Sequence, residues 1–358
     1  MPLFEHAEFD NHEHVLFCHD ESTGLKAIIA VHNTRLGPSL GGCRMWPYEN
    51  SFEALTDVLR LSKGMTYKAA MAGLPQGGGK AVIIGNPRAD KTPELMRAMG
   101  RSVNALNGQY LIAEDSGMTV QDIRFAAETT DYVAGISAQF SYDSDLNQAK
   151  QTRPNEADGN PAPSTAYGVF TGIKAAVLHV KGEDLTGKTV AIQGLGQVGL
   201  RLARLLHAAG AHLVVADIFD TNLAIAQDEL NANVVSPREI HAVKADVFAP
   251  CALGGTLNSN TLADISAGII AGAANNQLAS AAIADELTRL NKTYVPDYVL
   301  NAGGIIDIHH QRINSSAKQL REHLQSIGET VTEILSEAQK TGHSSEYVAN
   351  SLAEEKFK

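Results

Sequence analysis

Two lysines and a run of three glycines are the residues of this chain whose types and spacing best suit chemistry. Lys68 lies near the end of an amphipathic segment, and Lys80 follows the glycines at 77–79. Glycine permits positive φ angles and a close approach of the main chain to a ligand. The apolar run 81–84 would exclude water from Lys80 and favour its neutral amine, which can act as a base near pH 7. The alternative is a glycine turn before a strand, with Lys80 at the surface.

A carboxylate is expected beside these lysines. Residues 110–113 form a short apolar run typical of a buried strand, and Asp115 lies just after it. Open α/β folds keep their working groups in the loops at the carboxyl ends of strands. We therefore expect Asp115, Lys68 and Lys80 to meet in one site.

The second half of the chain contains a dinucleotide-binding pattern. An apolar strand at 188–193 precedes a Gly-x-Gly-x-x-Gly loop, a helix and a second strand at 213–216, which ends at Asp217. In such a unit the glycines make the turn, admit the pyrophosphate and permit close helix packing, while the acid binds the ribose hydroxyls. No arginine follows Asp217 directly to bind a 2′-phosphate, so NAD is favoured over NADP. The loop consists of Gly194, Leu195, Gly196, Gln197, Val198 and Gly199.

Further strands are predicted at 246–249, 268–271 and 293–295, each before a loop of small or polar residues. Small side chains let a flat cofactor approach the backbone, and Ala252 lies in the first of these loops. With NAD nearby, the three charged groups suit an amino-acid substrate. Lys68 would bind its carboxylate, Asp115 would deprotonate its amino group, and Lys80 would bond the carbonyl oxygen and activate water.

The predicted elements indicate an α/β fold with two domains. Short strands and a helix that begins after Asn50 lead to the lysines, so residues 1–137 are expected to form an α/β substrate-binding domain, to which the resemblance described below adds a role in oligomerisation. The polar stretch 138–163 is interpreted as a hinge, and residues 164–329 as a Rossmann-type NAD-binding domain. The tail from Ala317 to Ala349 is predicted to be helical, and from about residue 330 to pack back on the first domain. Its apolar stripe consists of Leu320, Leu324, Ile327, Val331 and Ile334.

Composition excludes several other classes of function. The chain has 358 residues and a formal net charge of −11, which disfavours nucleic acid and anionic membranes as partners. No apolar run is long enough to span a membrane, and the N-terminus lacks the pattern of a signal peptide. Three widely spaced cysteines indicate a reduced, cytoplasmic protein, and the scattered histidines give no metal-binding pattern.

Many motifs, in the same order, resemble the family of glutamate, leucine, phenylalanine and valine dehydrogenases, the leucine enzymes most closely. The resemblance covers nearly the whole chain. It is carried by residues 36–45, 63–68, 77–80, 113–115, 165–169, the glycine loop at 194–199, 271–278 and 296–304.

The resemblance implies reversible, NAD-dependent oxidative deamination of an L-amino acid to a 2-oxo acid and ammonium. By matching position, it makes Lys80 the catalytic lysine, Lys68 the ligand of the substrate carboxylate and Asp115 the group that moves protons. It further implies a cleft between the domains for the substrate, and a homo-oligomer such as a dimer or an octamer. The other implied contacts are the main chain of Gly41 and Gly42 with the substrate, and Thr165 and Asn275 with the nicotinamide.

Substrate choice depends on the residue before the paired glycines. Family members that act on glutamate carry lysine there, whereas this chain has Leu40, beside which a second carboxylate would be buried unpaired. An aliphatic pocket of Leu40, Ala113, Val295 and Val299 favours leucine, valine and isoleucine; Met65 either lines it or packs in the core.

Two alternatives remain open at this stage. Phenylalanine or tryptophan could be the substrate, because one or two methylenes change selectivity only about 10- to 200-fold. The chain could instead be an NAD-binding regulator without turnover. The presence of Lys68, Lys80 and Asp115 together favours the enzyme.

Overall fold

The computed structural model describes residues 3–136, 140–143, 148–151 and 160–358. These residues form two compact units. The first contains the described residues up to 136 together with Ala353–Lys358, and the second contains the remainder.

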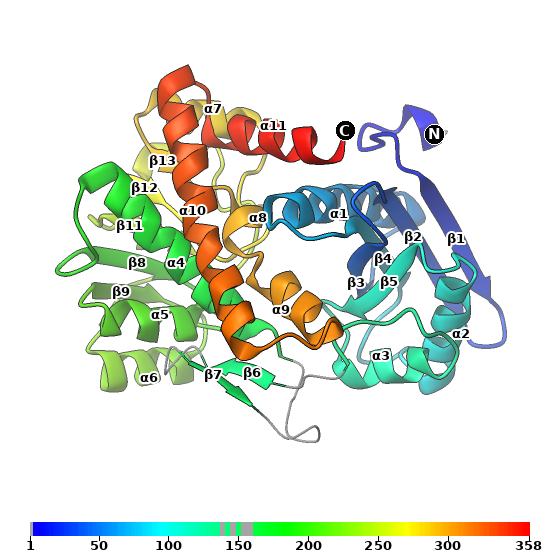
Figure 1. Cartoon of the computed structure of the whole chain (residues 1–358). Coiled ribbons are helices and arrows are strands. Elements are labelled where there is room, and N and C mark those ends of the chain that lie inside the picture. Colours follow the sequence, from blue (N-terminus) through cyan, green and yellow to red (C-terminus); the bar gives the residue numbers. More distant parts are fainter. Residues whose placement is uncertain (1–2, 137–139, 144–147, 152–159) are drawn as a thin grey trace. The chain divides into compact units, whose positions relative to one another are not determined.

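The first unit is built on a five-stranded sheet of order β1-β2-β4-β3-β5 (Figure 1). β2 is antiparallel to both of its neighbours, whereas β4, β3 and β5 run parallel. The parallel strands therefore end at one edge of the sheet. The strands are β1 (His14–Asp20), β2 (Leu25–Asn33), β3 (Ser39–Trp46), β4 (Gly77–Ile84) and β5 (Tyr110–Glu114).

Helices cover both faces of this sheet. α1 (Ser51–Met71) packs on one face, and α2 (Pro93–Asn104) and α3 (Val120–Ala127) pack on the other. Ala81 and Ile83 of β4 belong to the core under α2 and α3, whereas Val82 belongs to the core under α1. Because side chains alternate along a strand, Lys80 lies on the same face as Val82. We call this side of the sheet the α1 face.

α1 begins as the sequence predicts. Asn50 is its N-cap, and the Asn50 side chain accepts hydrogen bonds from the backbone N–H groups of Phe52 and Glu53. The Glu53 carboxylate accepts from the N–H of Glu49, one residue earlier than a capping box requires. The cap therefore satisfies the first turn of the helix that carries Lys68.

The three glycines at 77–79 act differently from the prediction. All three lie inside β4, and none has a positive φ. A Cβ atom would lie 1.9 Å from the Asn33 oxygen at Gly77, and 2.0 Å from the Thr66 nitrogen at Gly78. Neighbouring backbone approaches too closely for any side chain, so these glycines provide space rather than conformational freedom.

The second unit contains six parallel strands in the order β10-β9-β8-β11-β12-β13. Counted along the chain from β8, this is the 3-2-1-4-5-6 order of the Rossmann fold, which confirms the predicted α/β class. The strands are β8 (Thr189–Gln193), β9 (His212–Ala216), β10 (Asn233–Val234), β11 (Val247–Pro250), β12 (Ile269–Ile270) and β13 (Thr293–Tyr294).

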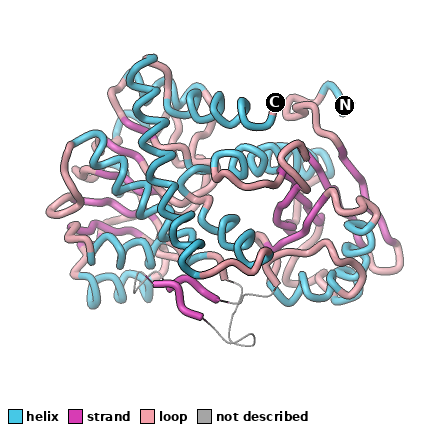
Figure 2. Tube along the Cα trace, viewed as in Figure 1, coloured by secondary structure: helices cyan, strands magenta, loops and turns pink. Residues whose placement is uncertain are grey.

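One α-helix lies between β8 and β9, one between β9 and β10 and one between β12 and β13, whereas only short 3₁₀ turns lie between β10, β11 and β12. Figure 2 shows the helices and strands by colour. None of the described helices is both long and apolar enough to cross a membrane. They are α4 (Ala162–Lys181), α5 (Gly199–Ala208), α6 (Asp220–Leu230), α7 (Ala282–Arg289), α8 (Asp297–Leu300), α9 (Gly303–Arg312), α10 (Ala317–Thr341) and α11 (Ser345–Phe357); short 3₁₀ turns occur at Leu3–Glu5, Ile240–Ala242 and Leu262–Asp264.

Two parts of the chain differ from the sequence prediction. The tail predicted as helical from Ala317 to Ala349 is divided into two helices, because Gly342 takes a positive φ of 74° and ends α10 before α11 begins. Within the stretch interpreted as a hinge, β6 (Phe140–Asp143) and β7 (Gln148–Gln151) form an antiparallel pair. Residues 138–139, 144–147 and 152–159 of that stretch lie outside the described part of the chain.

Different residues of the tail belong to the two units. α10 packs on α4, where Gly168 and Gly328 leave room for side chains of the opposite helix, Ile327 and Thr171 respectively. Only the last residues of α11, from Ala353, belong to the first unit. The tail therefore joins the first unit only from Ala353, and not from about residue 330.

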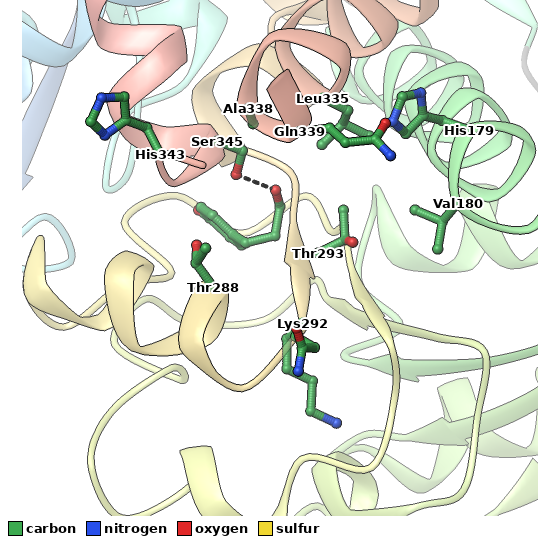
Figure 3. A pocket seen from close by; sticks show the side chains of 12 residues that line it. His179, Val180, Thr288, Lys292, Thr293, Leu335, Ala338, Gln339, His343 and Ser345 are labelled. Atoms are coloured by element: carbon green, nitrogen blue, oxygen red, sulfur yellow. Dashed lines mark hydrogen bonds between the residues drawn. The ribbon is translucent and has the colours of Figure 1, made fainter. Parts of the chain in front are cut away.

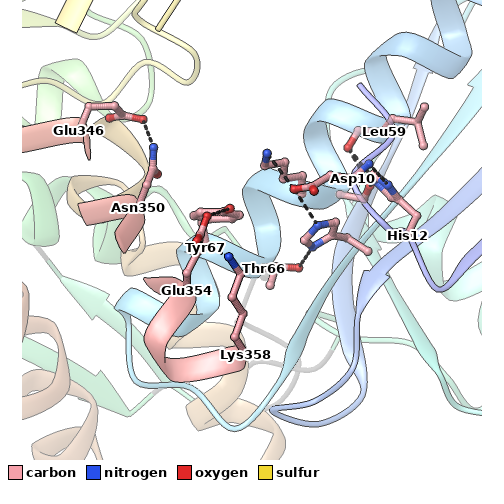
Figure 4. A network of polar contacts seen from close by, with 12 residues as sticks. Asp10, His12, Leu59, Thr66, Tyr67, Glu346, Asn350, Glu354 and Lys358 are labelled. Carbon is pink, nitrogen blue, oxygen red and sulfur yellow. Dashed lines mark hydrogen bonds and ion pairs between the residues drawn. The ribbon is translucent and has the colours of Figure 1, made fainter. Parts of the chain in front are cut away.

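His12 and His32 are two of the buried histidines of the first unit, and both contact α1 (Figure 4). The Nδ1 atom of His32 lies 2.8 Å from the Thr66 hydroxyl of α1, and Nε2 of His12 lies 3.1 Å from the Leu59 carbonyl oxygen. Their rings meet edge to face at 4.9 Å. Burial, together with the adjacent His12, lowers the pKa of His32 to about 4. His32 is therefore neutral in the folded protein near pH 7.

We predict that the protein loses stability as the pH falls from about 6.5 towards 4. The unfolded chain binds the His32 proton first, because its ordinary pKa of about 6.5 exceeds the folded value, so protonation favours unfolding in this range. His32→Asn, which can keep a bond to Thr66, should remove about 2–3 kcal/mol of that loss. Urea unfolding at pH 7 and pH 4.5 measures the difference in the free energy of unfolding between the two pH values. His19→Asn, at an exposed position of β1, is the control; equal pH slopes in His32→Asn and the parent protein would contradict the prediction.

Candidate functional site

The structure brings Lys80 and Asp115 together on the α1 face. The Lys80 Nζ atom lies 2.7 Å from Oδ2 of Asp115, and the lysine side chain is only 7% exposed. Lys80 comes from the middle of β4, and Asp115 follows the last residue of β5. Lys80 is thus buried, as its apolar neighbours in the sequence indicate. Its ammonium group forms an ion pair with Asp115.

Strand alternation explains why these groups meet. On β3, Leu40, Gly42 and Arg44 alternate with Cys43 and Met45, which pack under α2 and α3. The first three therefore point to the α1 face. Gly42 is paired with Ala113 of β5.

Gly42 gives Asp115 the space it occupies. A Cβ atom on Gly42 would lie 2.6 Å from the Cβ of Asp115. Gly41 is equally confined, since its Cβ would lie 1.7 Å from the Gly79 oxygen, and the Tyr110 hydroxyl donates a 2.7 Å hydrogen bond to its carbonyl. The paired glycines therefore let three parallel strands approach closely beside Lys80.

Positive groups determine the protonation of Asp115. Burial by itself would raise the pKa of Asp115, but Lys80 and Arg44 together hold it well below its usual range. The Arg44 Nε atom lies 3.2 Å from the same carboxylate oxygen that Lys80 contacts. Asp115 is consequently an ionised carboxylate at neutral pH.

Sequence reasoning missed the partners of Arg44. Its Nη1 atom lies 3.0 Å from Oδ2 of Asp57 on α1, and the Tyr48 hydroxyl donates a 2.6 Å hydrogen bond to that oxygen. The alternation of β3 could have placed Arg44 on the face of Leu40 and Gly42. No sequence spacing indicates Asp57, because the contact joins a strand to a helix.

The remaining predicted substrate residues of the first unit lie near this face. Leu40 and Ala113 are 1% and 2% exposed. Met65 and Lys68 are one helical turn apart near the end of α1 and are partly exposed. Val295 and Val299 belong to the second unit, where both are buried, so the aliphatic pocket remains a prediction.

In the second unit, each glycine of the predicted cofactor loop has its own geometry. Gly194 has a φ of 95°, and a Cβ on Gly199 would lie 1.9 Å from the Gly194 oxygen. By contrast, no heavy atom lies within 4 Å of a Cβ built on Gly196. α5 begins at Gly199, and its N-cap residue Val198 provides no side-chain cap. The loop thus makes a turn and a tight packing contact while keeping open space at the start of a helix, which suits a phosphate.

Asp217 and Ala252 lie at opposite sides of this loop. The Asp217 carboxylate accepts hydrogen bonds from the backbone N–H of Leu195 at 2.5 Å and of Phe219 at 2.8 Å. A Cβ on Gly194 would lie 2.8 Å from the Cβ of Ala252. Ala252 follows β11, the neighbour of β8, so it lies where the strand order reverses and where Rossmann folds bind their cofactor.

Thr165 and Asn275 lie around the start of α9. The Asn301 amide nitrogen donates to Oδ1 of Asn275 at 2.8 Å, and a Cβ on Gly304 would lie 3.1 Å from Oγ1 of Thr165. Oδ1 of Asn301 is buried without a hydrogen-bond partner in the described part of the chain. A carboxamide such as that of nicotinamide could donate to it. Asn301 was not predicted as a site residue, although it lies in the 296–304 motif.

A cavity of about 350 Å³ in the second unit contains none of these residues (Figure 3). It is lined by the ends of α4, α7 and α10, including His179, Gln339 and His343. Lys292 at its edge donates to the backbone oxygens of Ser266 and Ala267. Among the described side chains, no group of three or more His, Cys, Asp or Glu residues is arranged to hold a metal ion.

Known proteins with similar sequences share both units. Residues 12–132 match the sequence profile described as Glu/Leu/Phe/Val dehydrogenase, dimerisation domain. Residues 161–228 and 215–357 match the profile described as Glutamate/Leucine/Phenylalanine/Valine dehydrogenase. The two profiles together cover most of the chain.

Individual relatives align over nearly the full length. Leucine dehydrogenase of Bacillus subtilis is 45% identical over 358 residues, which is 100% of this chain and 94% of that protein. L-tryptophan dehydrogenase of Nostoc punctiforme is 44% identical over 359 residues, covering 100% of this chain and 96% of that protein. The crystal structure of the Nostoc punctiforme L-tryptophan dehydrogenase matches with a TM-score of 0.81 and 42% identity, over 97% of this chain and 96% of that one.

Replacing Asp115 by Asn should destabilise the first unit measurably. The substitution leaves Lys80 and Arg44 close together without their shared counterion. Because Asp115 is 23% exposed, we expect a loss of about 1–3 kcal/mol, below the cost for a fully buried pair. Urea unfolding at pH 7 tests this. Glu94→Gln, which breaks an exposed ion pair with Arg97, is the control and should change stability by under about 0.5 kcal/mol; an equal effect of both would contradict the prediction.

Proposed function

The chain belongs to the family of glutamate, leucine, phenylalanine and valine dehydrogenases, and from this we propose that it catalyses the reversible, NAD-dependent oxidative deamination of branched-chain L-amino acids. Leucine is the first substrate proposed, with valine and isoleucine beside it. The observation that carries the proposal is the contact of Lys80 with Asp115, at 2.7 Å on a largely buried face. The similarity to leucine dehydrogenase of Bacillus subtilis over the whole chain supports the substrate class.

The reaction converts an L-amino acid, water and NAD⁺ to a 2-oxo acid, ammonium, NADH and a proton. NAD⁺, when bound, supplies the acceptor for the hydride that leaves Cα. The protein must therefore bind the amino acid, remove a proton from its ammonium group, exclude bulk water and manage the protons of the single water consumed.

Substrate binding and the proton transfers fall to charged groups and to the main chain of the first unit. Asp115, ionised beside Lys80 and Arg44, accepts a proton from the substrate ammonium. Lys80 donates a hydrogen bond to the developing carbonyl oxygen and exchanges a proton with the attacking water. Lys68, at the end of α1, binds the substrate carboxylate, and the main chain of Gly41 and Gly42 contacts the substrate.

The residues of the second unit suit NAD. The open space at Gly196 and the start of α5 would hold the pyrophosphate, and Asp217 would accept from the ribose hydroxyls. Thr165, Asn275 and Asn301 would contact the nicotinamide. Ile218 and Phe219 follow Asp217, so no positive side chain directly after it favours a 2′-phosphate.

Leu40 supports an apolar substrate. It lies on the α1 face next to the paired glycines and, like Ala113, is almost fully buried. A glutamate side chain placed there would lose its hydration without gaining a counterion, which costs several kcal/mol. An aliphatic side chain would instead gain about 25 cal/mol for each Å² of apolar surface buried.

An aromatic substrate is the second candidate. The 44% identity to L-tryptophan dehydrogenase of Nostoc punctiforme is almost equal to that of the leucine enzyme, so overall similarity does not separate the two. Initial rates with leucine and with tryptophan separate the two candidates.

We also propose a homo-oligomer in the cytoplasm. The first unit matches a profile described as a dimerisation domain, and its edge strand β1 carries Phe17, which is 59% exposed. Trp46 and Phe52 are exposed as well. The cysteines Cys18, Cys43 and Cys251 are free thiols, which supports a reducing compartment.

A substrate panel tests the proposed function. NADH formation at 340 nm should be fastest with leucine, valine or isoleucine and NAD⁺, slower with phenylalanine and tryptophan, and slowest with glutamate; NADP⁺ should be a poor replacement. A preference for the aromatic pair would establish the second candidate. Absence of turnover with every amino acid would instead favour an NAD-binding regulator without catalytic activity.

Lys80→Ala should reduce turnover by at least about 10³-fold and leave NAD⁺ affinity nearly unchanged, because Lys80 belongs to the substrate side of the reaction. Steady-state rates and a direct NAD⁺ titration measure the two effects. Lys91→Ala, which removes another ion-paired lysine of the first unit, is the matched control. Loss of NAD⁺ binding in Lys80→Ala would show that its role has been misassigned.

A further inference from the structure

Arg44 lies on the α1 face between two carboxylates. Its Nε atom is 3.2 Å from Asp115 Oδ2, and its Nη1 atom is 3.0 Å from Asp57 Oδ2. The Arg44 side chain is only 22% exposed. A rigid planar guanidinium that meets two carboxylates through different nitrogens has its orientation fixed by both.

Asp57 is itself fixed from a second direction. It lies on α1, and the Tyr48 hydroxyl donates to its Oδ2 at 2.6 Å. Burial and the adjacent carboxylate raise the pKa of Tyr48, so this hydroxyl remains a donor. Arg44 is thus held on one side by a helix and on the other by the carboxylate at the end of β5.

The proposed reaction gives Lys80 two conflicting duties. Lys80 is a counterion of Asp115 and also exchanges protons during catalysis. Whenever Lys80 gives up its proton, Asp115 would lose that counterion. Arginine stays protonated throughout the physiological pH range, so Arg44 supplies a cation that does not change during the cycle.

We propose that Arg44, held by Asp57 and Tyr48, is a positioning residue that keeps the Asp115 carboxylate ionised and correctly oriented beside Lys80 while protons move. This inference rests on the proposed function. Arg44 acts through Asp115, and nothing in the proposal requires it to touch the substrate.

Other ionisable groups near Asp115 come from several elements. None of them can replace Arg44 as a permanent cation, since they are thiol or phenol groups whose pKa values are raised by burial, or a carboxylate. They are Cys43 on β3, Tyr48 before α1 and Tyr110 on β5, which interact electrostatically with Asp115, and Asp57 on α1, which shares Arg44 with it.

The first test is Arg44→Gln in the full-length enzyme, assayed with the best amino acid of the panel. We expect kcat to fall about 10- to 100-fold, because a shift of the Asp115 carboxylate by about 1 Å misaligns it with the substrate. KM for the amino acid should change less than about threefold. Added guanidinium chloride at low millimolar concentration should restore part of the rate to Arg44→Ala. Arg97→Gln is the matched control, because Arg97 also joins two carboxylates, Glu94 and Glu128, and should keep the parental rate.

Two milder variants keep the proposal testable if Arg44→Gln does not fold. Arg44→Lys retains the charge but cannot bridge both carboxylates in the same way, and Asp57→Asn removes the support of Arg44 from α1. Both should lower kcat several-fold at constant KM. Full kcat in both variants would overturn the proposal, as would an increase in KM with kcat unchanged, which would make Arg44 a substrate ligand.

A double-mutant cycle separates this inference from the proposed function. Unfolding of Arg44→Gln, Asp115→Asn and the double variant needs no turnover, and the double variant should lose less stability than the two single losses added. Strict additivity would overturn the inference. Absence of turnover in the parent enzyme would overturn the proposed function alone.

Discussion

The contact between Lys80 and Asp115 is the constraint on which the first unit depends. An ammonium group with a side chain only 7% exposed is tolerated when a carboxylate meets it, and here the carboxylate is 2.7 Å away. β4 and β5 are separated by β3 in the sheet, so the two groups must reach across that strand. Gly42 of β3, which has no side chain on that face, lies where the crossing occurs. Gly42 therefore matters first as space for an ion pair.

The same requirement for space extends to α1. Gly78 lies two residues before Lys80 and would, with a Cβ, lie 2.0 Å from the nitrogen of Thr66, two residues before Lys68. Close packing of helix on strand thus fixes the relative position of both lysine backbones. A chain with alanine at residue 78 would have to move α1 outward, and Lys68 would move with it. The roles proposed for Lys68 and Lys80 would therefore be coupled through backbone packing.

Local patterns were predictable from the sequence, and contacts between distant residues were not. The unit from β8 to Asp217 was predicted because its glycines, helix and acid are spaced along one short segment. The break at Gly342 was not predicted, because the apolar stripe that indicated the helix ends at Ile334 and one glycine alone does not end a helix. Asp57 was missed for a different reason: its contact with Arg44 depends on how α1 crosses the sheet, which no periodicity encodes.

The charge balance of the cluster argues that its composition reflects chemistry rather than stability. Lys80 and Arg44 face Asp115 and Asp57, so two positive and two negative groups are grouped in one partly buried region. Such a cluster contributes little net stability, because desolvation offsets much of the attraction, and apolar residues of similar volume often serve a core as well or better. Removing any one member leaves an unbalanced charge. A proton can nevertheless move within a neutral cluster without creating a net buried charge, and that is the property a deaminating site requires.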